Sequence, residues 1–243
     1  MDPGRIIGLI LAAGAALVVR FTGQGNWAGA LAGFVAAALA VLGFGPGALL
    51  PLATFVFGSG ILTRLGRARK ERAGMAEPNR GRRDVRHVAA KLGFPAILAA
   101  SVLVRPEASN ALALAYAAAL AGAFADTAGT ETGPLGTGPV VAWRGAKLER
   151  VEHGTAGGMS MLGILASIEG AGTVGVASLV TGLLPAPAAA IAAGAGWIAA
   201  AIESLVGGLA LGRALGHFGR NVLVSAIATA LGFTAGACGW GRP

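Results

Sequence analysis

Eight long apolar stretches divide this chain of 243 residues and constrain its fold more than any other feature. Apolar residues make up 55% of the chain and charged residues only 12%, whereas soluble domains carry about 25% charged residues. A soluble fold of this length could not bury all eight stretches. We therefore expect an all-α polytopic membrane protein, a single integral membrane domain over residues 1–243 with seven or eight transmembrane helices. The stretches are Ile6–Val19, Trp27–Gly43, Gly47–Leu62, Val88–Val104, Asn110–Ala125, Gly158–Leu184, Pro187–Leu211 and Val222–Trp240.

The rest of the composition argues against several other classes of protein. The 41 glycines are typical of membrane helices that pack closely. Cys238 is the only cysteine, which excludes a disulfide framework and a cysteine metal cluster. A net charge of +8 would suggest a nucleic-acid partner in a soluble protein. Here the basic residues lie between apolar stretches, so we expect a lipid bilayer and no nucleic acid.

The distribution of lysine and arginine predicts the orientation of the chain. If residues 64–91 are cytoplasmic, eight spans leave only Arg5, Arg105 and Arg242 on the outer side. The other basic residues then lie on the inner side, as the positive-inside rule requires. We therefore expect a multi-pass protein of the cell membrane with two functional cytoplasmic loops, a basic loop over 64–91 and an acidic, glycine-rich loop over 126–157. The active site would face the cytoplasm.

The basic loop has two interpretations that its residues leave open. It is either an ordinary positive-inside loop near anionic lipid or a phosphate-binding segment. In the second case Arg82 and Arg83 present planar guanidinium groups suited to phosphate, and Asp84 orients one of them. Asn79 and Arg80 precede this pair and would join it in binding substrate.

The acidic loop begins with Asp126 and Glu131, five residues apart with Thr127 between them. On a continuous helix the two carboxylates are about 140° apart, so they meet at one ion only if Gly129 breaks or tightens the turn. Oxygen ligands without His or Cys suit Mg²⁺, which shares its coordination with substrate phosphates. The alternative is an acidic pair solvated at a helix end.

A glycine-rich turn closes the same loop and opens the sixth apolar stretch. Free backbone N–H groups and the positive end of the helix dipole at such a position favour phosphate, and Lys147 lies in the same loop. The chain has no Walker motif. The residues of the turn expected to bind substrate are Gly154, Thr155, Gly157, Gly158 and Ser160.

Three further polar positions lie inside apolar stretches. Glu203, followed by Ser204, is expected about 14 Å below the inner surface, within reach of a cytoplasmic cleft. Asn221 begins a polar stripe with Ser225 and Thr229 that predicts either interhelical hydrogen bonds or one wall of that cleft. Glu169 lies near the middle of its stretch, and its role is left open.

Four motifs in this order resemble an integral-membrane family that includes the plant chloroplast phytyl-phosphate kinase and human transmembrane protein 19. They are GRRD at 81–84, FADTAGTETG at 124–133, GTAGGMSMLGILAS at 154–167 and ESLVG at 203–207. The resemblance covers most of the chain and implies a kinase that uses CTP or another NTP to convert an isoprenoid monophosphate to its diphosphate. It also implies distant kinship with membrane CTP-dependent lipid kinases and cytidylyltransferases. The chain departs from the family pattern at Lys91, where the family has an amide.

The motifs and the resemblance together give one hypothesis for the site. Asp126, Glu131, Arg82 and Arg83 would be catalytic, and Glu203 would join the two loop carboxylates in holding Mg²⁺. The partners would be a nucleoside triphosphate and an isoprenoid monophosphate in the bilayer, with a homo-oligomer left open. A cytidylyltransferase and a non-enzymatic transporter that uses Glu169 and Glu203 are the alternatives. The residues expected to bind substrate are Asn79, Arg80, Asp84, Thr127, Lys147, Gly154, Thr155, Gly157, Gly158, Ser160, Glu203, Ser204 and Asn221.

Overall fold

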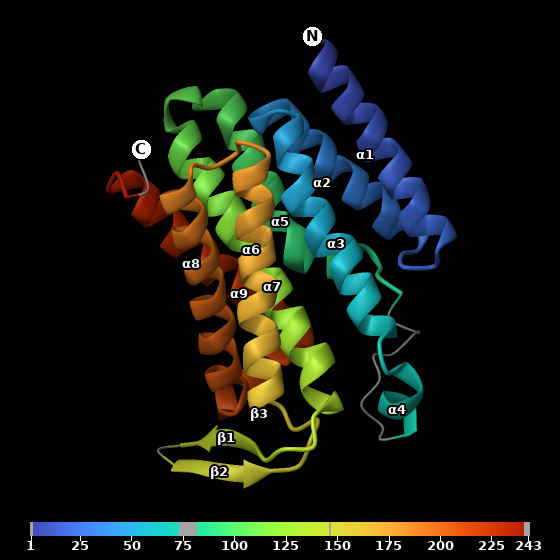
Figure 1. The fold of residues 1–243 in the computed structure, drawn as a ribbon, viewed down its shortest axis with the longest axis vertical. Coiled ribbons are helices and arrows are strands. Elements are labelled where there is room, and N and C mark those ends of the chain that lie inside the picture. The colour runs from blue at the N-terminus through green and yellow to red at the C-terminus, as the bar shows by residue number, and fades with distance from the viewer. Residues whose placement is uncertain (1, 73–81, 146, 241–243) are drawn as a thin grey trace.

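The computed structural model describes residues 2–72, 82–145 and 147–240 and shows a bundle of helices (Figure 1). Within these residues, eight helices are long and apolar enough to cross a membrane. The predicted fold class, an all-α polytopic membrane protein, is confirmed. The helices are α1 (Pro3–Phe21), α2 (Trp27–Phe44), α3 (Leu49–Arg64), the short α4 (Arg67–Arg72), α5 (Val85–Val104), α6 (Ser109–Thr132), α7 (Met161–Val180), α8 (Ala186–Gly207) and α9 (Ala210–Ala237). Single 3₁₀ turns lie at η1 (Pro46–Ala48), η3 (Pro106–Ala108) and η4 (Gly133–Leu135).

Helix α6 is the centre of the bundle and packs against α3, α5, α7, α8 and α9. Nearly all of its residues from Ala111 to Ala128 are buried, and most of them are alanine. Glycines of the neighbouring helices meet it at backbone distance: a Cβ on Gly196 would lie 2.5 Å from the amide nitrogen of Gly122. Small side chains allow this close approach where water does not drive helices together.

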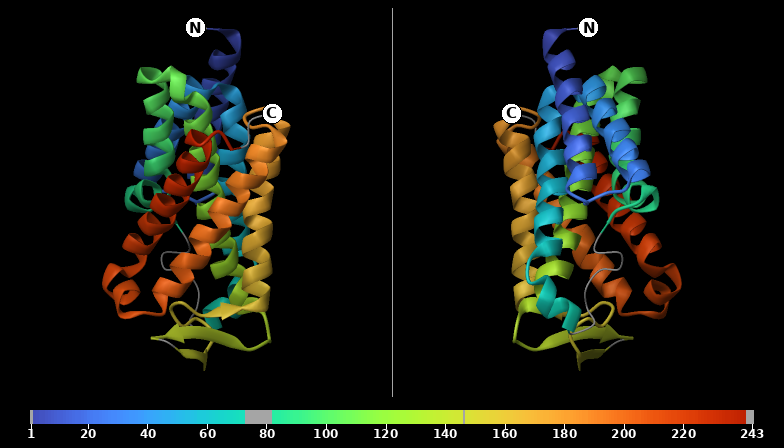
Figure 2. Two further views of the ribbon diagram at one scale, coloured as in Figure 1. Left: turned by 90° about the vertical axis from the view of Figure 1, so that its left-hand side faces the viewer. Right: turned by 90° about the vertical axis from the view of Figure 1, so that its right-hand side faces the viewer.

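A small antiparallel sheet connects α6 to α7, where the sequence predicted a loop. Its strands are β1 (Val140–Arg144), β2 (Lys147–Val151) and β3 (Met159–Ser160), in the order β2-β1-β3. Figures 1 and 2 show the sheet beyond one end of the bundle, which we call the hairpin end, and both chain ends at the opposite end.

Two helix boundaries differ from the predicted ones and place chemistry-bearing residues in helices. Helix α6 runs to Thr132, so Asp126 and Glu131 belong to the helix and not to a loop. Helix α5 begins at Val85, because the Asp84 side chain accepts the His87 backbone N–H at 3.0 Å and caps it. Lys91 is therefore buried in the second turn of α5, inside the region predicted as a basic loop.

Helix α9 is two helical segments joined at Gly216, whose φ of +62° ends the first. The second segment begins after this bend, at His217, five residues before the apolar stretch predicted to start at Val222. The bend places Arg220 and Asn221 in the first turns of this second segment. Helix α1 lies at the edge of the bundle, where it packs on α2 and η1 and is the least buried of the eight long helices described.

Candidate functional site

A cavity of about 350 Å³ lies at the hairpin end between α6, α7, α8 and α9. We call it the polar cavity. The chain from His153 to Ser160 closes it from outside the bundle. It gathers most of the site residues predicted in the acidic loop and the last three stretches. Its polar lining residues are Asp126, Thr130, His153, Thr155, Ser160, Ser167, Glu203, Ser204, His217, Arg220 and Asn221.

Asp126 reaches this cavity from α6 and forms a largely buried ion pair. Its Oδ2 atom accepts a hydrogen bond from Lys91 Nζ at 2.8 Å. The same ammonium donates to Thr127 Oγ1 at 2.7 Å and approaches the Ala123 carbonyl oxygen at 3.4 Å. Thr127 therefore holds the lysine and does not line the cavity. Lys91, where the chain departs from the family pattern, is therefore the ion-pair partner of Asp126.

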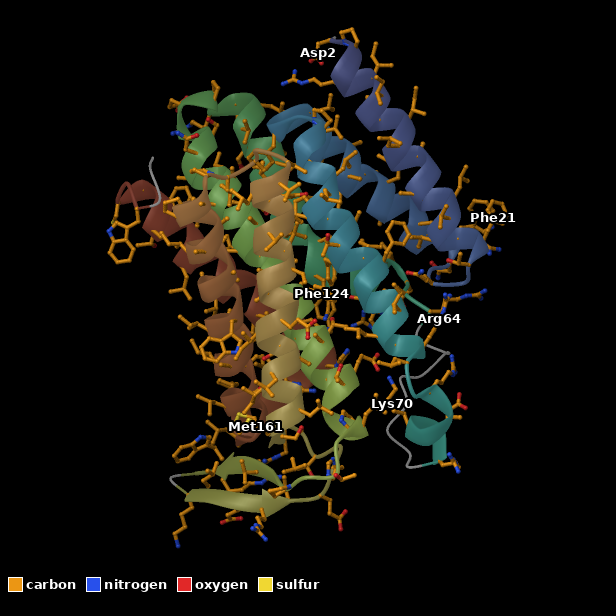
Figure 3. The ribbon with its side chains drawn as sticks, viewed as in Figure 1. Asp2, Phe21, Arg64, Lys70, Phe124 and Met161 are labelled. Atoms are coloured by element: carbon orange, nitrogen blue, oxygen red, sulfur yellow. The ribbon has the colours of Figure 1, made fainter. Side chains whose placement is uncertain are left out.

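Glu131 lies on another side of α6 and does not meet Asp126. It is buried and paired with the equally buried Lys70 of α4, whose ammonium also approaches the carbonyl oxygens of Leu62 and Thr63. Figure 3 shows Lys70 between α4 and the hairpin end of α6. Helix α6 continues unbroken through Gly129, which packs against Gly163 of α7. The condition for the two carboxylates to share an ion is therefore not met.

Glu203 is the second carboxylate of the polar cavity. It is buried on α8, and its Oε1 atom lies 3.3 Å from Nη1 of Arg220. Asp126 and Glu203 thus come from different helices, each beside a cation. Within the described residues, no three His, Cys, Asp or Glu side chains are grouped as ligands for one metal. A metal ion held here would complete its coordination with water or substrate oxygens.

The glycine-rich turn forms the outer wall of the polar cavity. The Gly158 N–H donates to the Thr155 carbonyl at 2.8 Å, and Gly157 has a φ of +74°. A Cβ on Gly157 would lie 2.2 Å from the Gly208 nitrogen, so the turn packs tightly on the end of α8. Ser160 caps α7 through its Oγ atom, which accepts the Gly163 N–H at 3.1 Å. The N-terminus of α7 therefore lies at the wall of the polar cavity, which Ser160 and Gly163 line.

A second cavity, of about 390 Å³, lies between α1, α2, α3 and α5. We call it the apolar cleft, because apolar side chains make up nearly all of its walls. Its basic lining residues are Arg83, His87 and Lys91. The exposed Arg82 lines neither cavity, and Asp84 binds His87 instead of orienting an arginine, with Nδ1 of His87 2.9 Å from its Oδ1 atom. Of the two arginines in the predicted phosphate-binding segment, Arg83 therefore lines a cavity and Arg82 does not.

The two cavities meet across α5. Lys91 lines the apolar cleft, and its ion-pair partner Asp126 lines the polar cavity. His87 lines the cleft and His217 lines the cavity, with their ring centroids 6.1 Å apart. Two side-chain contacts therefore connect the apolar cleft to the polar cavity.

Several predicted residues lie elsewhere. Asn79 and Arg80 fall outside the described residues. Lys147 is exposed on β2 and lines neither cavity. Glu169 is exposed on the outer face of α7, so it does not share a path with Glu203 as a transporter would need.

The polar stripe on α9 was predicted either to form interhelical hydrogen bonds or to line a cleft, and different residues of it do each. Asn221 lines the polar cavity, whereas Ser225 donates a hydrogen bond to the Ala90 carbonyl of α5 at 3.1 Å. Sequence reasoning missed Arg220 and Lys70 as partners of the carboxylates. A basic residue beside Asn221 at the start of a span was the available signal for Arg220. Nothing in the sequence links Lys70 to Glu131, because they are 61 residues apart.

The comparisons with known proteins concern the family and not the chemistry. The uncharacterized membrane protein sll0875 of Synechocystis sp. is 31% identical over 163 residues, which are 66% of this chain. The chain covers 62% of that relative's length. No solved structure matches this chain. The model of an integral membrane family matches residues 9–233. The chain therefore belongs to the family described as integral membrane protein DUF92.

Proposed function

We propose that this protein is a Mg²⁺-dependent kinase that transfers a phosphoryl group from CTP or another nucleoside triphosphate to an isoprenoid monophosphate. The observation that carries the proposal is the set of residues that line the polar cavity. Two carboxylates, an arginine and a glycine-rich turn at a helix N-terminus line one space. This combination suits a metal nucleotide. The resemblance of the four motifs to the family of the phytyl-phosphate kinase supports the same activity.

The donor set of the cavity fits Mg²⁺. Asp126 and Glu203 supply oxygen ligands from two helices, and Mg²⁺ is commonly held by one or two carboxylates plus substrate phosphates. Glu131 lines neither cavity, so it takes no part in this proposed site. When bound, the ion would neutralise charge on the nucleotide phosphates.

The reaction needs no strong general base. A lipid phosphate monoester is largely a dianion near neutral pH, because its second pKa is about 6. One of its oxygens attacks the γ-phosphorus, and the bond from that phosphorus to the β–γ bridging oxygen breaks. The products are the lipid diphosphate and the nucleoside diphosphate, and no proton is transferred. Positioning and charge stabilisation supply the catalysis.

The remaining side chains take positions around that reaction. Arg220 lines the cavity beside Glu203 and would contact the nucleotide phosphates. The turn from Gly154 to Gly158 would place backbone N–H groups on the same phosphates. Asn221 is buried beside Arg220 and would fix one phosphate oxygen. Lys91 would neutralise the attacking phosphate from the side of the apolar cleft.

A cytidylyltransferase would use the same cavity but a different bond. It would release pyrophosphate and leave a CMP-linked lipid, so the products separate the two reactions. The decisive experiment incubates purified protein with Mg²⁺, each NTP in turn and geranylgeranyl or phytyl monophosphate. Lipid diphosphate with an equal amount of nucleoside diphosphate is expected. A CMP-linked product, or no product with any nucleotide, would overturn the proposal.

A further inference from the structure

We infer that the apolar cleft is the binding site for the acceptor lipid, with its hydrocarbon tail between α1, α2, α3 and α5 and its phosphate at Arg83, His87 and Lys91. The inference rests on the proposed function for the identity of the lipid, but it concerns a separate cavity that sequence reasoning did not locate. The shape and apolar lining of the cleft, the charge at one of its ends and its position relative to the polar cavity each support this inference.

The shape of the cleft suits a chain and not a compact polar molecule. Its lining residues on α1 extend from Leu11 to Val19, which is about 12 Å along the helix at 1.5 Å per residue. Beyond them it continues to Pro46, which approaches α1 near Gly8. Almost all of this length is lined by aliphatic and aromatic side chains. An extended hydrocarbon chain matches such walls.

The charge of the cleft is concentrated at one end. Arg83, His87 and Lys91 lie within nine residues around the start of α5, whereas the residues at the far end, Pro46 and Leu49, are apolar. The backbone of Arg83 is fixed by hydrogen bonds with Gln24 and Asn26 at 2.9 and 3.1 Å. A guanidinium at one end of an apolar cleft complements a phosphate on a hydrophobic tail, and Lys91, whose ammonium contacts Asp126 and Thr127, lies toward the polar cavity from there.

The charged end of the cleft is also the end that meets the polar cavity. A phosphate bound by Lys91 would lie beside Asp126, the carboxylate that Lys91 already contacts at 2.8 Å. His87 and His217 form a second boundary between the two spaces. A lipid phosphate in the cleft and a nucleotide in the cavity would therefore approach each other across α5. Free inorganic phosphate would use the charged end but gain nothing from the apolar walls.

The tail site is tested by filling the cleft. Gly33 lines the cleft, and a Cβ there would meet nothing within 4 Å, so Gly33→Leu adds a side chain to the space without displacing the fold. Gly14→Leu is the matched control, because a Cβ on Gly14 of α1 also meets nothing within 4 Å but the residue does not line the cleft. The probe is geranylgeranyl monophosphate with a diazirine at the end of its tail.

Photolabelling of the protein in detergent, with the labelled peptides identified by mass spectrometry, gives the readout. We expect labels on α1 and α3 that excess geranylgeranyl monophosphate displaces and inorganic phosphate does not. Gly33→Leu should lower this displaceable labelling about tenfold, as expected for the loss of about 1.4 kcal/mol of binding. Gly14→Leu should leave it unchanged. Labelling outside the cleft, or labelling insensitive to Gly33→Leu, would overturn the inference.

Substitutions of two neighbouring arginines test the phosphate end of the apolar cleft. Arg83→Gln should weaken binding of the monophosphate probe about tenfold or more, because it removes a charge-assisted hydrogen bond to the phosphate. Arg82→Gln, at an exposed position outside the cleft, should have no comparable effect. Binding of the corresponding alcohol, which lacks the phosphate, should respond to neither change. Equal losses in both variants would show that the loop's charge acts as a whole and would overturn the assignment of Arg83.

Failure of this inference differs from failure of the proposed function. If the probe labels the cleft but no nucleotide yields lipid diphosphate, the cleft is a lipid-phosphate site and the kinase proposal fails. If lipid diphosphate forms while the probe labels only other surfaces, the kinase proposal stands and the cleft assignment fails.

Discussion

Helix α6 carries two buried ion pairs that look alike and have different surroundings. Lys91–Asp126 lies between the apolar cleft and the polar cavity, so a ligand in either space could replace one partner. Lys70–Glu131 lines neither of these two spaces and is surrounded by backbone carbonyls of α3 and α6. Of these two buried carboxylates, Asp126 is the one whose cation partner a ligand could replace.

The largest expected effect comes from the exchangeable pair. Asp126→Asn should lower kcat about 10²- to 10³-fold, because it removes a charged ligand from the centre that stabilises the transition state. The measurement is the rate of lipid diphosphate formation at saturating nucleotide, with circular dichroism as the control for folding. Activity that survives in a folded Asp126→Asn protein would remove Asp126 from the proposed site.

Disrupting the Lys70–Glu131 pair should lower the stability of the protein and leave kcat unchanged. Glu131→Gln leaves the Lys70 ammonium buried without its carboxylate, which costs about 3 to 5 kcal/mol. Thermal unfolding in detergent should show a lower Tm, while kcat of the folded fraction stays at the wild-type level. The double change Lys70→Met with Glu131→Leu should recover much of the lost stability, because no charge is then left unpaired. A fall in kcat equal to that of Asp126→Asn would erase the distinction between the pairs.

A substitution in the glycine-rich turn tests the outer wall of the polar cavity, and so extends the comparison beyond the ion pairs of α6. Gly157→Ala places a Cβ against the Gly208 nitrogen and forces a left-handed conformation that costs about 1 to 2 kcal/mol. We expect the KM for nucleotide to rise about tenfold. Gly138→Ala, where a Cβ meets nothing within 4 Å, is the control and should change little. Equal effects at both positions would mean that the turn has no special role.

The smallest effect is expected at a partly buried acidic residue outside the membrane spans. Asp84 caps α5, and the hydrogen bond from the His87 backbone N–H lowers the pKa of its carboxyl group below 3.8. Asp84→Ala should cost about 1 kcal/mol of stability near neutral pH. Because the folded pKa is lowered, the part of this stability that comes from the ionised carboxylate is present above about pH 4 and is lost as the pH falls through the folded pKa.

Unfolding in detergent at pH 7 and at pH 3 checks this prediction. The difference between wild type and Asp84→Ala should shrink at the lower pH. Asp84→Asn retains a capping oxygen and should stay close to wild type at pH 7. A difference that grows on acidification would contradict the assigned direction of the pKa.

The hydropathy of the sequence was sufficient for the fold class and limited the number of membrane spans to seven or eight, and the described residues contain eight candidate spans. Runs such as Trp27–Gly43 have few charged positions, so only a bilayer-spanning helix satisfies their backbone groups. The boundaries were less accurate where polar residues continue a helix. Thr127 to Thr132 continue α6 although the sequence predicted a loop there, and the charge of Glu131 in this extension is paired with Lys70, 61 residues away in the chain.

The grouping within the polar cavity was only partly predictable. Asp126, Glu203, Asn221 and the glycine turn were recognised as polar features at helix ends or within spans, and the structure places them in one space. The separation of Arg83 from Arg82 was not predictable, because it depends on a backbone contact with the chain at Gln24 and Asn26.

By itself the sequence determined that this chain crosses a membrane as a helical bundle and which polar residues that bundle must accommodate, because burying a charge in hydrocarbon is unfavourable wherever the chain runs. Only the tertiary structure decided which lysine or arginine accompanies each carboxylate. Ion pairs form between atoms that the packing of α6 against its neighbours brings within a few ångströms, and that proximity is independent of separation along the chain.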